Sequence, residues 1–444
     1  MPITRRLAVA VGAWCVAGAV AASTASAGTT PPIAYVPTAD GPRVTMVPLG
    51  ARTAGRAPWK LQVSFRCEDQ TVTGAVPVRV DRSGRFEAQT KRLVTKADVG
   101  SDTEVTIRGR LRDTAAEGSI DAHARAYDNA GTTFECTRDD IAWRAEATSN
   151  PGAERVERFF PTSVDADALA VTSDAVFVDE DHGDKPSIVK RLDPRTGKRN
   201  WARRVGDADR VAAGTERVWV ANGAKGQVIG LDARTGRIAS TTTVGPGSFD
   251  AIAPLTPQPL AITADAVWVA TSGGLVRLDP ATGQETTRVP VGAAETVVAG
   301  PTGVVTAVAV SDADGRPVAS RIVRVDPGTD QAVAEATVDK RPGSFHLTAG
   351  ADAIILAGDD EPVVRLHSET LAPLSPNDVV TDGLGAVAAP SGTWVSTPDG
   401  LVALDASGAA VARVRTISGE LAAAGDTMWV LDAGAGGVVR LRGG

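Results

Sequence analysis

Acidic side chains are densest in the segment Asp179-Glu-Asp-His-Gly-Asp184. Hard cations such as Ca²⁺ bind several oxygen ligands at once, so Asp179, Asp181 and Asp184 are candidate calcium ligands. Their spacing matches no EF-hand loop, and a solvated surface loop explains the same residues equally well. We expect the solvated loop and keep calcium as the alternative; no other cofactor is indicated.

A second group of acidic residues recurs just ahead of short apolar segments. In three repeats the acidic residue stands two positions before the first apolar residue, and two further acidic residues lie near equivalent places. Together with one histidine they are candidate binding residues: Asp167, Asp209, Asp250, Glu295, His346 and Glu420. Such a ring of negative charge would suit a cation or a basic segment of a partner. Aspartates that each cap a separate turn explain the same pattern.

We assign no catalytic residue. The chain contains 4 His, and they do not cluster with acidic residues in a pattern typical of a metal-dependent enzyme. We find no Ser-His-Asp order, glycine-rich phosphate loop or zinc-ligand spacing. The Trp residues recur at repeat positions typical of core packing. A non-catalytic protein is therefore the expectation, and a metal-dependent enzyme is the alternative.

The overall charge excludes several classes of partner. The chain has 46 Lys and Arg against 53 Asp and Glu, a net charge of −7. Proteins that bind nucleic acid need a basic surface to neutralise phosphates. The acidic balance therefore argues against nucleic acid and against anionic lipid surfaces. It is also a common solution for solubility.

The chain begins with the pattern of an export signal. Arg5 and Arg6 precede the apolar stretch from Leu7 to Ala22, and Ala25-Ser-Ala27 matches a small-x-small cleavage site. The apolar stretch is too short and too rich in Ala and Gly for a membrane anchor. We expect residues 1–27 to be a signal peptide cleaved near Ala27, and the protein to be secreted without membrane insertion.

Beyond that signal only two cysteines remain, Cys67 and Cys136. In an exported chain a lone pair is most simply a disulfide. Closing so long a loop stabilises the fold by about 4 kcal/mol in the chain-entropy model. A metal site would need further ligands, and only His123 is available nearby in the sequence.

Residues 33–147 show short segments of alternating apolar and polar residues, typical of strands with one buried face. Two such segments are Leu61-Gln-Val-Ser-Phe65 and Val105-Thr-Ile-Arg-Gly-Arg-Leu111. We predict a small antiparallel β-sandwich. Its predicted core aromatics are Trp59, Phe65, Phe86 and Trp143. Residues 148–154 are a linker by composition.

Residues 155–444 repeat a pattern at intervals of about 40 residues, the length of one four-stranded propeller blade. Each unit carries a bulky marker on its second strand, seven in all: Phe177, Trp219, Trp268, Val305, Ile355, Trp394 and Trp429. Most third strands end in a turn such as Asp279-Pro-Ala-Thr-Gly283. There Pro presets φ, Asp accepts a nearby backbone N–H, and Gly takes the left-handed position. We predict an all-β protein with a seven-bladed propeller over residues 155–444.

The ends of this region predict how the ring closes. The seventh unit stops after a third strand, Val438–Leu441, and the region begins with an orphan strand, Arg155–Phe160. Pairing the two would complete the last blade and remove two exposed sheet edges.

The two faces of such a propeller differ. Turns between first and second strands and between third and fourth strands share one face, and here they are short and stereotyped. The opposite face carries longer and more varied loops, for example Gly245–Pro259. Binding sites are commonly built on variable loops held by a rigid scaffold. We expect any ligand at the channel mouth on this loop-rich face.

The Trp-Val and Leu-Asp-Pro-x-Thr-Gly elements resemble those of secreted YncE-like, YVTN-type or quinoprotein-like repeat propellers. The preceding Cys67, Cys136 and Trp143 layout is similar to small all-β modules of secreted actinobacterial proteins. The resemblance implies the propeller fold but no single activity, since the group includes binding proteins, quinoprotein enzymes and a lyase. We expect an exported, monomeric, non-catalytic binding protein with a protein or cell-envelope ligand. A lyase- or quinoprotein-like metal-dependent enzyme is the alternative.

Overall fold

A computed structural model describes most of the chain beyond the proposed export signal. The described residues are 33–37, 42–49, 58–67, 70–90, 94–95, 100–127, 133–149, 155–163, 166–181, 186–223, 225–245, 258–340, 345–358, 362–374, 380, 383–390, 392–415, 417–432 and 435–442. Residues 32–444 form one compact unit, and the elements within its described part are β-strands. The all-β expectation is confirmed.

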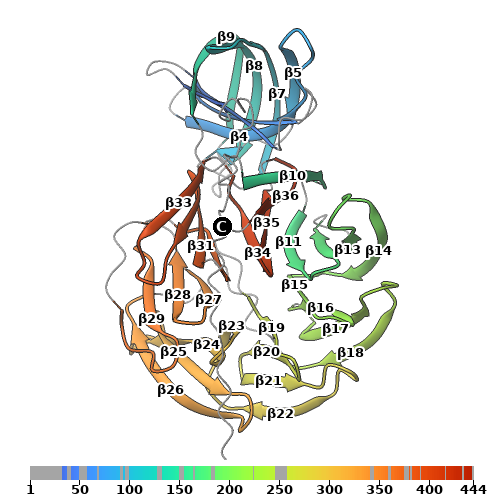
Figure 1. The fold of residues 1–444 in the computed structure, drawn as a ribbon, viewed down its shortest axis with the longest axis vertical. Helices are drawn as coiled ribbons and strands as arrows, with labels where there is room; N and C mark the ends of the chain where they lie inside the picture. Colours follow the sequence, from blue (N-terminus) through green and yellow to red (C-terminus); the bar gives the residue numbers. More distant parts are fainter. Residues whose placement is uncertain are drawn as a thin grey trace, which may run out of the picture. The chain divides into compact units, whose positions relative to one another are not determined.

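The N-terminal part forms one antiparallel sheet of nine strands, drawn in blue to teal in Figure 1. The strands are β1 (Ile33–Pro37), β2 (Arg43–Pro48), β3 (Trp59–Cys67), β4 (Gln70–Val78), β5 (Arg85–Thr90), β6 (Val94–Thr95), β7 (Gly100–Leu111), β8 (Ala115–Tyr127) and β9 (Thr133–Ser149). Their order is β5-β7-β8-β9-β1-β2-β3-β4-β6.

The predicted β-sandwich is not confirmed, because the described strands pair into one continuous sheet. β8 and β9 pair from Ala115↔Glu146 to Tyr127↔Thr133, which keeps that sheet continuous. Its side chains nevertheless share one core, because Phe65, Phe86 and Trp143 are buried together and Trp59 packs against them. The four predicted core aromatics are thus confirmed.

Two boundaries need separate comment. Pairing of Ile33 with Ser149 extends β9 into the first two residues of the predicted linker. The backbones of Cys67 and Cys136 belong to β3 and β9, but their side chains lie outside what the structure describes. The disulfide stays a prediction.

The rest of the chain forms small antiparallel sheets, each built mainly from consecutive strands. The first three contain β11 (Ala166–Val171), β12 (Val176–Glu180), β13 (Ser187–Leu192) and β14 (Arg199–Gly206); β15 (Arg210–Ala213), β16 (Arg217–Asn222), β17 (Gln227–Asp232) and β18 (Ile238–Thr243); and β19 (Leu260–Ile262), β20 (Val267–Thr271), β21 (Gly274–Leu278) and β22 (Glu285–Val289).

The later sheets follow the same plan. They contain β23 (Ala294–Gly300), β24 (Gly303–Ser311), β25 (Pro317–Asp326) and β26 (Gln331–Val338); β27 (Phe345–Ala349), β28 (Ala353–Gly358) and β29 (Val364–His367); β30 (Gly385–Ala389), β31 (Gly392–Thr397), β32 (Gly400–Leu404) and β33 (Ala410–Arg415); and β34 (Glu420–Ala424), β35 (Thr427–Asp432) and β36 (Gly437–Arg442) with β10 (Val156–Pro161).

The first strand of each sheet contacts the first strand of the next, and β34 contacts β11 in turn. This closed series of inner strands makes the region a β-propeller, and Figure 1 shows the sheets around a common centre. The predicted closure is confirmed, since β10 pairs with β36 through Phe159↔Val439 and Phe160↔Val438. Phe160 also stacks on Trp429, with ring centroids 5.7 Å apart.

The repeat turns behave as their sequence predicts. The carboxylate of Asp279 accepts the backbone N–H of Ala281 at 2.9 Å and of Thr282 at 2.7 Å. Hydrogen bonds from the Thr282 hydroxyl and amide lower the pKa of Asp279. The bulky markers Trp219, Trp268 and Trp394 are among the largest fully buried side chains. Turn chemistry and core packing thus define each sheet.

Candidate binding site

Strand register shows which inner-strand residues share a level of the channel. Ala212 pairs with Trp219, Thr348 with Ile355 and Ala422 with Trp429, and each partner is a second-strand marker. The residues two positions earlier therefore lie at equivalent levels. In chain order they are Ala168, Arg210, Pro259, Thr296, His346, Gly385 and Glu420. This channel-mouth layer lies at the loop-rich end of the propeller.

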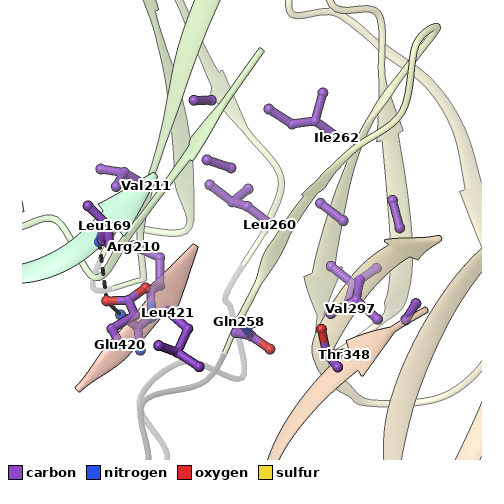
Figure 2. A pocket seen from close by; sticks show the side chains of 16 residues that line it. Leu169, Arg210, Val211, Gln258, Leu260, Ile262, Val297, Thr348, Glu420 and Leu421 are labelled. Atoms are coloured by element: carbon purple, nitrogen blue, oxygen red, sulfur yellow. Dashed lines mark hydrogen bonds and ion pairs between the residues drawn. The ribbon is translucent and has the colours of Figure 1, made fainter. Parts of the chain in front are cut away.

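Behind the channel-mouth layer the wall becomes apolar. The next level contains Leu169, Val211, Leu260, Val297, Leu347, Ala386 and Leu421. A cavity of about 290 Å³ is lined by residues from both of these levels and from the levels that follow them along the inner strands. In Figure 2, Arg210 and Glu420 lie together on one side of it, with Val297 and Thr348 on the other. Although aliphatic residues line the cavity, its accessible surface is mainly polar.

Arg210 and Glu420 form an ion pair within the channel-mouth layer. Arg210 Nη1 lies 2.9 Å from Glu420 Oε2, which also accepts the Leu169 backbone N–H at 3.2 Å. Burial raises the pKa of Glu420 to about 7, although the Arg210 charge opposes the shift. The pair ties β34 to β11 and β15.

Asp167 and Glu295 lie on two other inner strands, β11 and β23, and both occupy β-bulges. The register of β11 slips between Ala166 and Ala168, and that of β23 slips between Ala294 and Thr296. Each bulge adds one acidic residue to the inner strand, a use typical of bulges at functional rims. Burial raises the pKa of Glu295. Neither carboxylate forms a hydrogen bond or ion pair with another part of the described chain.

His346 belongs to the channel-mouth layer but does not act as a charged group. Its side chain is buried in β27. Burial and the nearby Arg210 charge lower the pKa of His346 to about 3. The imidazole is therefore neutral at physiological pH.

Asp209 has a different role from its neighbours. Its carboxylate accepts the backbone N–H of Gly223, and its own N–H binds the carbonyl oxygen of Ala221 at 2.9 Å. This geometry matches the turn-capping explanation for Asp209. Asp250 lies outside the described residues.

The three calcium candidates do not assemble into a described metal site. Asp179 is fully buried in β12, Asp181 is exposed, and Asp184 falls outside the described residues. Within the described ranges, no group of three or more metal-ligating side chains comes together. Burial, followed by the negative charges of Asp167 and Asp181, raises the pKa of Asp179 to about 8. Both carboxyl oxygens of Asp179 lack a hydrogen-bond partner.

Three polar residues that line the cavity, Arg210, Gln258 and Thr348, are not among the residues that the sequence indicated. Arg210 occupies the same register position as His346 and Glu420, so aligning the strands on their bulky markers would have revealed it. Gln258 precedes Pro259 and has no such signal. Its side-chain oxygen Oε1 is buried at the cavity without a hydrogen-bond partner.

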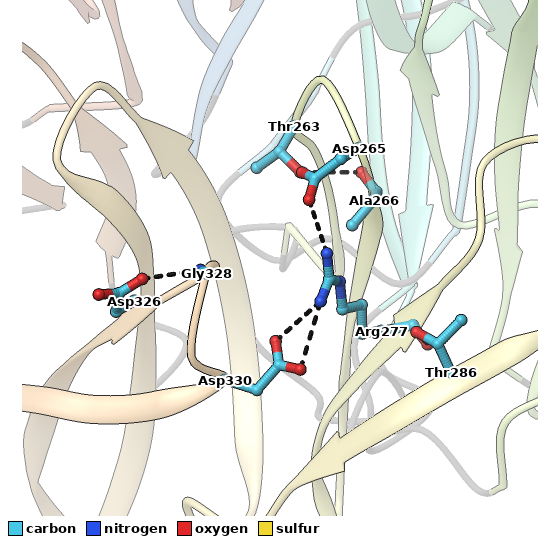
Figure 3. A network of polar contacts seen from close by, with 8 residues as sticks. All are labelled: Thr263, Asp265, Ala266, Arg277, Thr286, Asp326, Gly328 and Asp330. Atoms are coloured by element: carbon cyan, nitrogen blue, oxygen red, sulfur yellow. Dashed lines mark hydrogen bonds and ion pairs between the residues drawn. The ribbon is translucent and has the colours of Figure 1, made fainter.

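On the opposite face, several arginines bind the turns of neighbouring sheets. An arginine two residues before the turn reaches the turn of the following sheet: Arg277 to Asp330, Arg324 to the Glu369 carbonyl, Arg365 to the Ser407 carbonyl and Arg440 to the Pro194 carbonyl. Figure 3 shows Arg277 held between Asp265 and Asp330. Its guanidinium carbon also lies 5.7 Å from the centre of the Trp268 ring. These contacts join neighbouring blades.

Replacing Arg277 with Met should lower the free energy of unfolding by about 2 kcal/mol, because charge-assisted hydrogen bonds are lost. Arg277 Nη2 lies 2.6 Å from Asp265 Oδ2, and its side chain is 20% exposed. Urea unfolding followed by Trp fluorescence measures the change. Arg316→Met serves as the control on an exposed turn. Equal stability of the Arg277→Met and native proteins would show that the contacts do not stabilise the fold.

The structure was compared with known proteins. No protein-family model and no curated protein sequence matches the chain. Among the described residues, the structure contains no helix that could span a membrane.

The solved structures that resemble the fold include the following three. BamB from Moraxella catarrhalis is 16% identical, with a TM-score of 0.45 over 83% of this chain and 96% of that one. The Neurospora crassa Pan2 WD40 domain is 12% identical, with a TM-score of 0.46 over 62% and 88%. PorZ, a surface component of the type-IX secretion system of Porphyromonas gingivalis, is 13% identical, with a TM-score of 0.44 over 64% and 37%.

Proposed function

We propose that the protein is an exported, non-catalytic binding protein that holds a protein or cell-envelope ligand at its loop-rich propeller face. One observation carries the proposal: two acidic side chains at the channel mouth have no bonded partner in the described chain and stand beside an open cavity. At the channel mouth, Asp167 and Glu295 have no bonded partner in the described chain, and an open cavity lies behind them. On the opposite face, arginines and turns bind one another.

The finer architecture belongs to the same proposal. The six four-stranded sheets and one three-stranded sheet of the described propeller region support a seven-bladed ring. The Arg5-Arg6 and Ala25-Ser-Ala27 signals support export, and resemblance of the repeats to YncE-like proteins is compatible with it. The metal-dependent enzyme is the weaker alternative, because the sequence contains no convergent set of catalytic groups.

A comparison of the two faces tests the proposal. We expect Asp167→Asn combined with Glu295→Gln to weaken binding of the protein to an envelope preparation from the source cells at least tenfold, measured by co-sedimentation. The matched control removes two exposed charges on the opposite face, through Asp352→Asn with Asp426→Asn. Equal losses in both variants would contradict a binding site at the loop-rich face, as would a loss confined to the control.

A further inference from the structure

We propose that the rim of the first propeller sheet binds an extended, acidic segment of a protein partner, which pairs with β14 as an additional strand. This surface is separate from the loop-rich face, so the inference goes beyond the proposed function. Two observations carry it together. The outer edge of β14 has no paired strand in the described chain, and the surface around that edge is strongly basic.

The basic residues gather on β14, on the turn before it and on the turn between β17 and β18. We call them the basic rim: Lys198, Arg199, Arg203, Arg204, Arg234 and Arg237. All of them are exposed, and none forms an ion pair with another described residue. Two acidic residues of the same turns, Asp193 and Asp232, accept backbone N–H groups within their own turns. The rim therefore has an excess of positive charge, although the whole chain has a net charge of −7.

Contacts between the first and second sheets bring the two parts of the basic rim together. Trp201 of β14 donates its indole N–H to the Ala233 carbonyl oxygen at 3.0 Å. Arg203 Nε donates to the Gly236 carbonyl oxygen at 2.7 Å. Both acceptors belong to the turn between β17 and β18. That turn therefore lies against β14 and adds its own arginines to the same surface.

The outer edge of β14 is available for strand pairing. β14 is the last strand of its sheet, whose order is β11-β12-β13-β14, and it lies on the outer rim of the propeller in Figure 1. It pairs with β13 from Ser187↔Gly206 to Leu192↔Arg199, and no strand of the described chain pairs with its other side. Such an edge presents backbone N–H and C=O groups that can pair with an extended peptide.

Charged residues on an edge strand can also serve to block unwanted pairing. The outer strands of the other sheets do not use basic residues in this way. β18 has no charged residue, Arg288 of β22 pairs with Glu285, and Glu335 of β26 pairs with Arg321. β33 has two arginines, but the turn before it contains no basic residue. The combination of a basic strand with basic turns is specific to β14, which favours a binding surface.

An acidic polypeptide complements both features of this surface. The guanidinium group of arginine binds a carboxylate through two parallel hydrogen bonds, and all but one of the rim residues are arginines. Side chains on paired strands lie opposite one another, so acidic residues of an added strand would face the arginines of β14. An anionic polymer without peptide groups would satisfy the charges but would leave the backbone of the edge unpaired.

Fluorescence anisotropy of the full protein with defined peptides tests the inference. We expect a labelled peptide of alternating Glu and Thr to bind and to slow hydrogen exchange of the β14 amides. The same peptide with alternate backbone nitrogens methylated keeps its charge but loses N–H donors, and it should bind at least tenfold more weakly. Arg199→Gln with Arg204→Gln should also weaken binding at least tenfold. Arg316→Gln with Arg413→Gln removes two exposed arginines elsewhere on the propeller and should leave the affinity unchanged.

Three other results would overturn the inference. Equal binding of the plain and methylated peptides would show that charge alone attracts the peptide, without strand pairing. If inorganic polyphosphate binds the native protein more tightly than the Glu-Thr peptide and loses affinity in the Arg199→Gln and Arg204→Gln variant, the rim is a site for an anionic polymer. Absence of peptide binding would remove the inference, and it would leave the effect of Asp167 and Glu295 on envelope binding untouched.

Discussion

Asp179→Asn is expected to raise the free energy of unfolding at pH 8 by about 3 kcal/mol, because folding at that pH requires the native Asp179 carboxyl to take up a proton that the unfolded chain has released. Asp179 is 0% exposed and neither of its oxygens has a hydrogen-bond partner. Its pKa is about 8 in the folded protein, against 3.8 as the ordinary value. Asparagine has nearly the same shape and never ionises. Urea unfolding at a series of pH values measures the difference.

The sign of the pH dependence follows from linkage. Between pH 3.8 and about 8 the folded protein keeps a proton on Asp179 that the unfolded chain releases. The stability that the protonated Asp179 contributes is therefore fully present below pH 3.8, and it is lost as the pH rises to about 8. The free energy of unfolding of the native protein should therefore fall, relative to that of Asp179→Asn, as the pH rises from 4 to 8. The two proteins should have similar free energies of unfolding near pH 4. Glu420 titrates in both proteins and cancels in the comparison.

If the difference in free energy of unfolding between the native protein and Asp179→Asn stays the same from pH 4 to pH 8, Asp179 does not have the raised pKa. Asp426→Asn is the control, because Asp426 is exposed in the turn between β34 and β35. It should shift stability little at any pH.

Lys60→Met is expected to lower the free energy of unfolding by about 4 kcal/mol, because it leaves the buried Asp432 carboxylate without its counter-ion. Lys60 Nζ and Asp432 Oδ2 lie 2.6 Å apart. Lys60 is 4% exposed and Asp432 is 1% exposed. Asp432 Oδ1 also accepts the Ala435 backbone N–H at 2.9 Å, so the carboxylate remains fixed in place. Thermal and urea unfolding of the full protein give the change.

A double-mutant cycle separates the pair from the packing of each side chain. Lys60→Met with Asp432→Asn removes both charges and should recover most of the stability lost in Lys60→Met. Lys198→Met, at an exposed turn, is the matched control for losing a lysine. Additive losses in the double variant would show that Lys60 and Asp432 do not stabilise each other.

The propeller could be predicted from the sequence because its signals are local. Turn carboxylates such as Asp279 and bulky markers such as Trp268 each act within one hairpin. Their spacing along the sequence therefore indicates the positions of the successive sheets. The closure of the ring was also predictable. The strand around Phe159 belongs to no complete repeat unit, and the last unit has only three strands of its own, so the two complete each other.

Other features depend on contacts far apart in the chain. Lys60 and Asp432 are 372 residues apart, and no local pattern links them. The single N-terminal sheet depends on long continuous pairing of β8 with β9, whereas alternation alone fits one sheet or two. Asp167 and Asp209 look alike in sequence, yet one lies on a bulge at the channel mouth and the other caps Gly223.

Site-specific photo-crosslinking tests the binding face most directly. Asp399 and Asp426 are both exposed residues of short turns, but the first lies between β31 and β32 on the loop-rich face and the second lies on the opposite face. We would place benzoylphenylalanine at each position and irradiate cells that export the protein. We expect a discrete crosslinked product from position 399 and none from position 426. A product from position 426 alone would contradict it.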